Sequence, residues 1–320
     1  MYKIQKINDD TIWNNFIDQS PNGNIYFKSF FLDSLKDKVS KNFIIKGNQI
    51  KAGFVLVHDK DLNIIDNENI IYSGIIFNKY EDKSTSSYNL DTFSITEFFV
   101  QHLVANFKNI QFNTVPDFLD VRPFLWHNYN KKKNVFKCYP KYTSFIDINN
   151  CSDEINDPKN LFNKMNTLRR RLIRKGIQNL TKFKTTTDIS YLVKSYENYM
   201  IKQQSPVSSQ KINEMKKLFK NLLDNKKLLI KIAYTKEGDA GYLCIFAYDL
   251  KVGYFLYGCP LVDKVENYLG SITFWQVFKD LKKKGIDLVD MEGINSPNRG
   301  WFKQSFGGVI KQYFEIKLKN

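Results

Sequence analysis

One lysine near the C-terminal end of this 320-residue sequence has neighbours that suit it for chemistry. Lys303 follows Phe302 directly and precedes Phe306 by three residues, a spacing that can hold an ammonium against apolar surface. An ammonium held in this way can stabilise a phosphate, or the negative charge that develops on a carbonyl oxygen during acyl transfer. The alternative is a short helix in which the two phenylalanines anchor the core and Lys303 is the solvated side. Taken alone, the spacing favours this alternative.

The stretch around this lysine, from Glu292 to Gly308, is rich in glycine and polar residues. Apolar runs at residues 286–291 and 309–318 flank it, which predicts two strands joined by a connection. Connections that leave strand ends often hold binding and catalytic residues. Arg299 and Trp301 belong to the same stretch, and we regard them as substrate-binding candidates. Tyr257, in the predicted strand at residues 252–258, completes this group.

Two arginines form a second candidate cluster earlier in the chain. Arg170 and Arg174 are four residues apart, which places them on one face of a helix. Such a pair can bind a diphosphate or a carboxylate through forked hydrogen bonds. A solvated helix face explains them about as well. The opposite face of the expected helix is apolar and consists of Leu161, Met165, Leu168 and Leu172.

Residues 300–307, with the sequence GWFKQSFG, resemble the Phe-Lys segment of the Fem family of aminoacyltransferases. These enzymes build peptidoglycan cross-bridges, and their FemAB-like relatives belong to the GNAT acyltransferase superfamily. Residues 13–32 resemble the opening of the family, and residues 142–176 resemble the entry to its second lobe. The three segments occur in the family's order, so the resemblance covers most of the chain.

The order of predicted elements agrees with the fold that this resemblance implies. Both halves contain a strand, helices, three strands, a helix, a strand, a connection and a final strand, which is the order of a GNAT lobe. We therefore expect an α/β (α+β) protein made of tandem GNAT-like lobes, each with a mixed, mostly antiparallel sheet flanked by helices. The expected lobes are residues 1–141 and 142–320. The resemblance implies that the last strand, at about residues 308–319, packs on the first lobe.

The resemblance also implies a reaction, which is transfer of an aminoacyl or acyl group to an amine of a cell-envelope precursor. The acceptor would be a peptidoglycan peptide or an amino sugar, linked to a nucleotide or a lipid. The donor would be aminoacyl-tRNA, and no further cofactor would be needed. Phe302 and Lys303 match the residues that contact the aminoacylated end in the family. Arg170 and Arg174 would hold the acceptor.

Two alternatives to this reaction stay open. An ordinary GNAT enzyme would use acyl-CoA, whose pyrophosphate is held by a glycine-containing loop. The corresponding loop, residues 266–271, keeps only one glycine, and this argues against CoA. The other alternative is a protein without catalytic activity that binds RNA or a membrane surface through its basic charge. That protein would show strongly salt-dependent binding and no acyl transfer.

Composition limits the remaining possibilities. The net charge of +15 suits contact with phosphates, nucleic acid or, transiently, an anionic membrane surface. The four cysteines form no C-x-x-C pair and the three histidines have no partners at ligand spacing, so we expect no metal site. No apolar run is long enough for a transmembrane helix and no signal peptide is recognisable, so we expect a cytoplasmic protein.

The general base cannot be chosen from sequence. Asp287, Asp290 and Glu292 are candidates, and buried carboxylates that accept backbone hydrogen bonds explain them equally well. His127 lies between Trp126 and Tyr129, which is more typical of a packed histidine than of a catalytic one.

Overall fold

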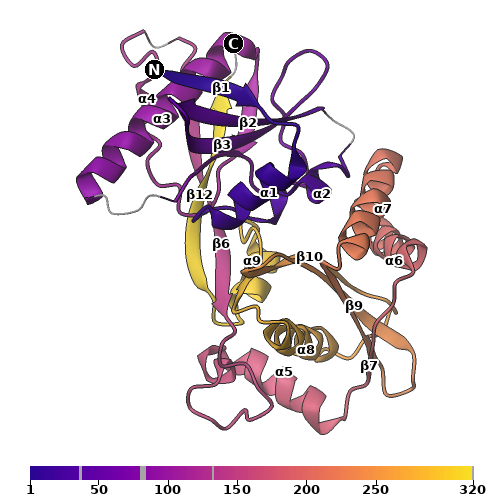
Figure 1. The fold of residues 1–320 in the computed structure, drawn as a ribbon. Helices are drawn as coiled ribbons and strands as arrows, with labels where there is room; N and C mark the ends of the chain where they lie inside the picture. Colours follow the sequence, from indigo (N-terminus) through magenta and orange to yellow (C-terminus); the bar gives the residue numbers. More distant parts are fainter. Residues whose placement is uncertain (36–37, 80–83, 132, 319–320) are drawn as a thin grey trace. The chain divides into compact units, whose positions relative to one another are not determined.

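The computed structural model describes residues 1–35, 38–79, 84–131 and 133–318 (Figure 1). The chain forms two compact units, of which unit 1 contains residues 1–142 and 311–320 and unit 2 contains residues 143–310. Strands β6 (Lys137–Asp147) and β12 (Val309–Leu318) each begin in one unit and end in the other. Helices flank antiparallel and mixed sheets, which confirms the expected α/β (α+β) class.

Unit 1 is built on an antiparallel sheet with the strand order β1-β2-β3-β4. Strand β5 pairs with β12 in antiparallel fashion, so the end of the chain completes this unit. The apolar face of the long helix α3 includes Ile95, Phe99 and Leu103, all of which are buried. The elements are β1 (Tyr2–Lys6), α1 (Asp10–Gln19), η1 (Ile25–Phe27), α2 (Ser29–Leu32), β2 (Lys38–Lys46), β3 (Gln49–His58), β4 (Gly74–Phe77), α3 (Thr85–Asn106), β5 (Ile110–Asn113) and α4 (Arg122–Trp126).

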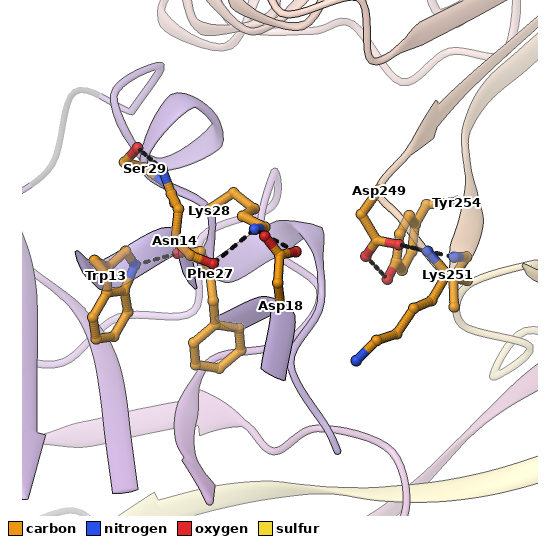
Figure 2. A network of polar contacts seen from close by, with 10 residues as sticks. Trp13, Asn14, Asp18, Phe27, Lys28, Ser29, Asp249, Lys251 and Tyr254 are labelled. Carbon is orange, nitrogen blue, oxygen red and sulfur yellow. Dashed lines mark hydrogen bonds and ion pairs between the residues drawn. The ribbon is translucent and has the colours of Figure 1, made fainter. Parts of the chain in front are cut away.

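A buried polar network fastens helix α1 to the segment that follows it (Figure 2). The indole Nε1 of Trp13 donates to the carbonyl oxygen of Phe27 at 2.6 Å. The ammonium of Lys28 donates to the carbonyl oxygen of Asn14 at 2.9 Å and lies 2.6 Å from the carboxylate of Asp18. Because each of these groups is satisfied, the turn after α1 holds a fixed conformation.

Unit 2 contains a sheet with the strand order β6-β11-β10-β9-β8-β7. Strands β10 and β11 run parallel, and the other pairs run antiparallel. The core of this unit lies around helix α8, whose residues Phe274, Trp275 and Phe278 are fully buried. The elements between β6 and β12 are η2 (Leu161–Lys164), α5 (Thr167–Gln178), β7 (Phe183–Lys184), α6 (Ile189–Lys202), α7 (Ser209–Asp224), β8 (Leu228–Tyr234), β9 (Ala240–Tyr248), β10 (Val252–Pro260), α8 (Leu269–Lys283), β11 (Leu288–Asp290) and α9 (Pro297–Gln304).

The turn between β9 and β10 is fixed by Asp249, which is 7% exposed (Figure 2). Its carboxylate accepts hydrogen bonds from the backbone N–H of Lys251 at 2.7 Å and of Val252 at 2.8 Å. The hydroxyl of Tyr254 donates to the other carboxylate oxygen at 2.6 Å. These bonds set where β10 begins and hence which of its side chains reach the site described below.

None of the described helices is both long and apolar enough to cross a membrane.

Candidate active site

The candidate site lies where strands β10 and β11 stop pairing. Their parallel register covers three residue pairs and ends at Tyr254 and Asp290. In β10 the register with β9 shifts between Phe255 and Tyr257, which marks a β-bulge. On the other side the chain turns away after β11, and Glu292 adopts a left-handed backbone with φ 55°. The bulge and the turn open one side of β10 along residues 255–258.

Helix α9 brings the Phe-Lys segment to this opening. It begins at Pro297, a residue suited to the first turn of a helix because it has no N–H to satisfy. Gly300 is required by a close approach, since a Cβ atom at this position would lie 2.5 Å from the carbonyl oxygen of Ile294. Gly307 follows the helix with φ 83°, which favours glycine. The glycines of the sequence motif therefore set the position of the helix.

A cavity of about 350 Å³ occupies the opening. Residues from α6, β9, β10 and α9 of unit 2 form its wall, so it combines aromatic surface with two cationic groups. Four of the candidates from the sequence meet here: Lys303, Phe302, Arg299 and Tyr257. The complete lining is Tyr196, Tyr199, Met200, Tyr242, Phe255, Leu256, Tyr257, Gly258, Asn298, Arg299, Phe302 and Lys303.

The ammonium of Lys303 is held at the wall of this cavity. It donates to the carbonyl oxygen of Gly293 at 3.1 Å and to that of Glu292 at 3.4 Å, and it lies 5.2 Å from the ring centroid of Phe255. Lys303 is therefore fixed in place. The short helix and the two phenylalanine anchors of the alternative are present, but the Lys303 ammonium is bound to carbonyl groups and is not simply solvated. An ammonium has three N–H donors, and the two carbonyl groups hold it at a fixed place on the cavity wall.

The pKa values of Lys303 and Glu292 are perturbed in opposite directions. Burial lowers the pKa of Lys303, and the neighbouring carboxylates of Glu292 and Asp290 oppose that shift. Burial raises the pKa of Glu292, and the charge of Lys303 opposes this. Burial thus pushes both groups toward their neutral forms while their mutual attraction favours the charged ones, so the two groups titrate as a pair.

The three acidic candidates for a general base have different surroundings. Asp290 is fully buried and accepts hydrogen bonds from the Thr143 hydroxyl at 2.5 Å and from the N–H of Glu292 at 2.7 Å. Asp287 forms an ion pair with Lys282 at 2.6 Å. Glu292 interacts electrostatically with Lys303, which makes it the carboxylate most closely linked to the cavity wall.

A buried arginine that the sequence analysis overlooked supports the same wall. Arg169 is 5% exposed and donates to the hydroxyl of Ser305 at 2.9 Å and to that of Ser271. Its guanidinium carbon lies 4.3 Å from the ring centroid of Phe302 and 4.6 Å from that of Phe306. Burial lowers its pKa to about 10. Arg169 therefore ties α9 to α5 and α8 and fixes the Phe302 ring.

The expected apolar face of helix α5 was partly wrong, and this explains the oversight. The helix starts at Thr167, after Asn166 caps it, so Leu161 and Met165 lie outside it and do not set its phase. The buried face consists of Arg169, Leu172, Ile173 and Gly176, whereas Leu168 is 49% exposed. The cap at Asn166 was the signal that could have given the correct phase.

The remaining binding candidates lie outside the described lining of the cavity. Arg174 is exposed, with its guanidinium carbon 4.9 Å from the ring centroid of Phe162, and Arg170 is half-buried. Trp301 is 75% exposed on α9. His127 packs on Phe136 in unit 1 with ring centroids 5.7 Å apart, and burial lowers its pKa.

Among the described residues, no group of three or more histidine, cysteine or acidic side chains could hold a metal ion.

Comparison with known proteins identifies the fold. No protein-family model and no curated protein matches the sequence. Among solved structures, FemX has a TM-score of 0.64 at 11% identity, with 98% of this chain and 96% of FemX covered. A tandem GNAT protein from the clavulanic acid biosynthesis pathway has a TM-score of 0.56 at 8% identity, covering 99% and 98% of the two chains.

A third similar structure is the C-terminal domain of a putative lysylphosphatidylglycerol synthetase from Agrobacterium fabrum. Its TM-score is 0.56 at 10% identity, with 96% of this chain and 90% of that chain covered. The three matches confirm, at the level of the fold, the expected likeness to the Fem family and to tandem GNAT proteins. Because fold alone does not fix function, the activity has to be argued from the cavity.

Proposed function

We propose that this protein is an N-acyltransferase that moves an aminoacyl group from aminoacyl-tRNA to an amine of a cell-envelope precursor. The observation that carries the proposal is the Lys303 ammonium, which two carbonyl groups fix at the wall of an aromatic-lined cavity. The likeness to FemX and to a putative lysylphosphatidylglycerol synthetase supports an envelope-related substrate linked to a nucleotide or a lipid.

For aminoacyl transfer the protein mainly has to position the two substrates and stabilise the charge of the transition state. The acceptor nitrogen attacks the carbonyl carbon of the donor ester, and the C–N bond forms as the carbonyl oxygen becomes an oxyanion. The ribose oxygen then leaves and takes up the proton that the amine loses. A preorganised donor near the oxyanion stabilises the transition state in a site that excludes water, and we assign this role to Lys303.

The other candidates have roles that follow from their places. Phe302 and Tyr257 give the cavity flat apolar walls for the donor's terminal group, and Arg299 at the same wall pairs with a phosphate. Arg170 and Arg174 hold the acceptor's phosphate in this proposal, and Trp301 adds exposed aromatic surface for the substrate. Glu292 is our candidate for relaying the amine proton to the leaving ribose oxygen, because it interacts with Lys303 at the cavity wall and its raised pKa makes it a stronger base than an ordinary glutamate.

The acyl-CoA alternative is less well supported by the loop before α8. The Glu266 carboxylate lies two residues before the N-cap Tyr268 and accepts the N–H of Lys236 at 3.2 Å. A carboxylate close to this helix start repels a pyrophosphate.

Ligand stabilisation separates the two donors, because a ligand that binds only the folded state raises the melting temperature. We expect a stable amide analogue of an aminoacylated RNA end to raise the melting temperature, and coenzyme A to leave it unchanged. An uncharged RNA end is the matched control. Stabilisation by coenzyme A alone would replace our donor assignment with acyl-CoA.

A further inference from the structure

A second surface of the protein, in unit 1, combines exposed apolar side chains with lysines. Helix α4 and the turn after it expose Leu125 to 45%, Trp126 to 55% and Tyr129 to 72%. Leu90 on helix α3 is 67% exposed. Large side chains of this kind are costly to leave in water when they gather at one place, and such patches mark interaction sites.

The patch is rigid because its base is well packed. Phe124, in the same helix turn, is fully buried and lies 5.3 Å from the ring of Phe136. The ring of Trp126 lies 5.2 Å from that of Phe93, which is three residues after Leu90 on α3. The Arg122 guanidinium carbon lies 5.6 Å from the centroid of the Trp126 ring. The exposed edge of Trp126 is therefore presented in a fixed orientation.

The charge beside the patch is positive. Asp120 forms an ion pair with Arg122 at 2.7 Å, so these two charges balance. Lys131 and Lys133 are exposed and follow Tyr129 within four residues. The chain as a whole carries a formal charge of +15, which adds a long-range attraction to any anionic surface.

We propose that this patch docks the protein on an anionic phospholipid surface. Tryptophan and tyrosine prefer the boundary between lipid head groups and acyl chains, where leucine enters the apolar layer and nearby lysines pair with anionic head groups. A lipid surface fits better than RNA because the patch also exposes Leu90 and Leu125, which suit an apolar layer and offer a base no ring to stack on. Docking of this kind would bring the enzyme to a lipid-linked acceptor.

Tryptophan fluorescence gives a direct test, because two of the four tryptophans are buried and their emission should not respond to vesicles. Trp13 and Trp275 are fully buried, whereas Trp126 and Trp301 are exposed. In a Trp301→Phe protein, Trp126 is therefore the reporter. We expect phosphatidylglycerol-containing vesicles to shift its emission to shorter wavelength, and brominated lipid in the same vesicles to quench it. Vesicles of phosphatidylcholine alone should do neither.

Variants then separate the apolar and the charged contributions in a sedimentation assay without donor or acceptor. Trp126→Ser should abolish binding to the anionic vesicles, while Leu250→Ser, at a residue 62% exposed in unit 2, should not change it. Lys131→Gln and Lys133→Gln should each weaken binding by roughly five-fold at low salt, because one lysine near an anionic membrane contributes about that factor.

Either of two results would overturn the proposal. One is a Trp126 emission that anionic vesicles leave unshifted. The other is a shift that a single-stranded RNA produces and vesicles do not, which would assign the patch to nucleic acid. Because these measurements need no acyl transfer, they stand or fall independently of the proposed reaction.

Discussion

Replacing Lys303 with methionine tests the role of this residue most sharply. Methionine keeps most of the side chain's length and removes the ammonium that lies 5.2 Å from the ring centroid of Phe255. The carbonyl oxygens of Glu292 and Gly293 hold this ammonium in place, and the proposed mechanism assigns one of its N–H donors to the oxyanion. Loss of one such donor typically lowers kcat by about 10²–10³, which corresponds to about 3–4 kcal/mol.

The assay is single-turnover transfer from aminoacyl-tRNA at saturating acceptor, so that substrate affinity does not enter. The variant leaves the two carbonyl groups without their donor, which lowers its stability. A melting curve is therefore needed to show that the variant is folded. Lys283→Met, at an exposed lysine in the last turn of α8, is the matched control and should keep the wild-type rate. A folded Lys303→Met protein with the wild-type single-turnover rate would refute the oxyanion role.

Three further predictions concern the supports of the site. Gly300→Ala should lower the free energy of unfolding by about 1–3 kcal/mol, measured by urea denaturation, because its Cβ would meet the Ile294 carbonyl oxygen at 2.5 Å; an unchanged midpoint would contradict the close approach. Arg169→Met should raise the KM for the donor more than it lowers kcat. Arg169→Lys should not restore the KM, because an ammonium cannot cover both phenylalanine rings in the way that the planar guanidinium does. A wild-type KM in Arg169→Lys would show that only the positive charge of Arg169 matters. The pKa of Glu292 is raised to about 8 from 4.5, so the folded state binds its proton more tightly than the unfolded state. The melting temperature of the wild-type protein should therefore fall as the pH rises from about 4.5 to about 8. Glu292→Gln should lack this fall, and the same pH dependence in the two proteins would contradict the shift.

The sequence predicts the local backbone of the candidate site where its residues carry local constraints. Gly300 allows the backbone to approach the carbonyl oxygen of Ile294, and Gly307 adopts a left-handed conformation. Glycines at such positions are recognisable in the sequence as limits of a short helix. Tyr257 and Lys303 share one cavity, and although both were candidates, no local pattern in the sequence places them side by side. Their proximity depends on the bulge in β10 and the end of β11, which are properties of strand pairing and leave no local signal.

The buried role of Arg169 could not be predicted from the sequence. Polar residues are expected on the solvated face of a helix, so the phase of α5 was set from leucines and this arginine was assigned no role. Its burial is tolerated because two serine hydroxyls and two aromatic rings satisfy it, and these partners come from segments more than a hundred residues away. Partners that distant cannot be inferred from helical periodicity.

The central claim is transfer of an aminoacyl group from tRNA to an amine of an envelope precursor. The most direct measurement incubates the purified protein and an envelope-precursor extract with a pool of tRNAs charged with labelled amino acids, and in parallel with labelled acetyl-CoA. We predict acid-stable, amide-linked label from the tRNA pool and none from acetyl-CoA. Label from acetyl-CoA alone would contradict the donor, and label from neither would contradict the assignment of this cavity to acyl transfer.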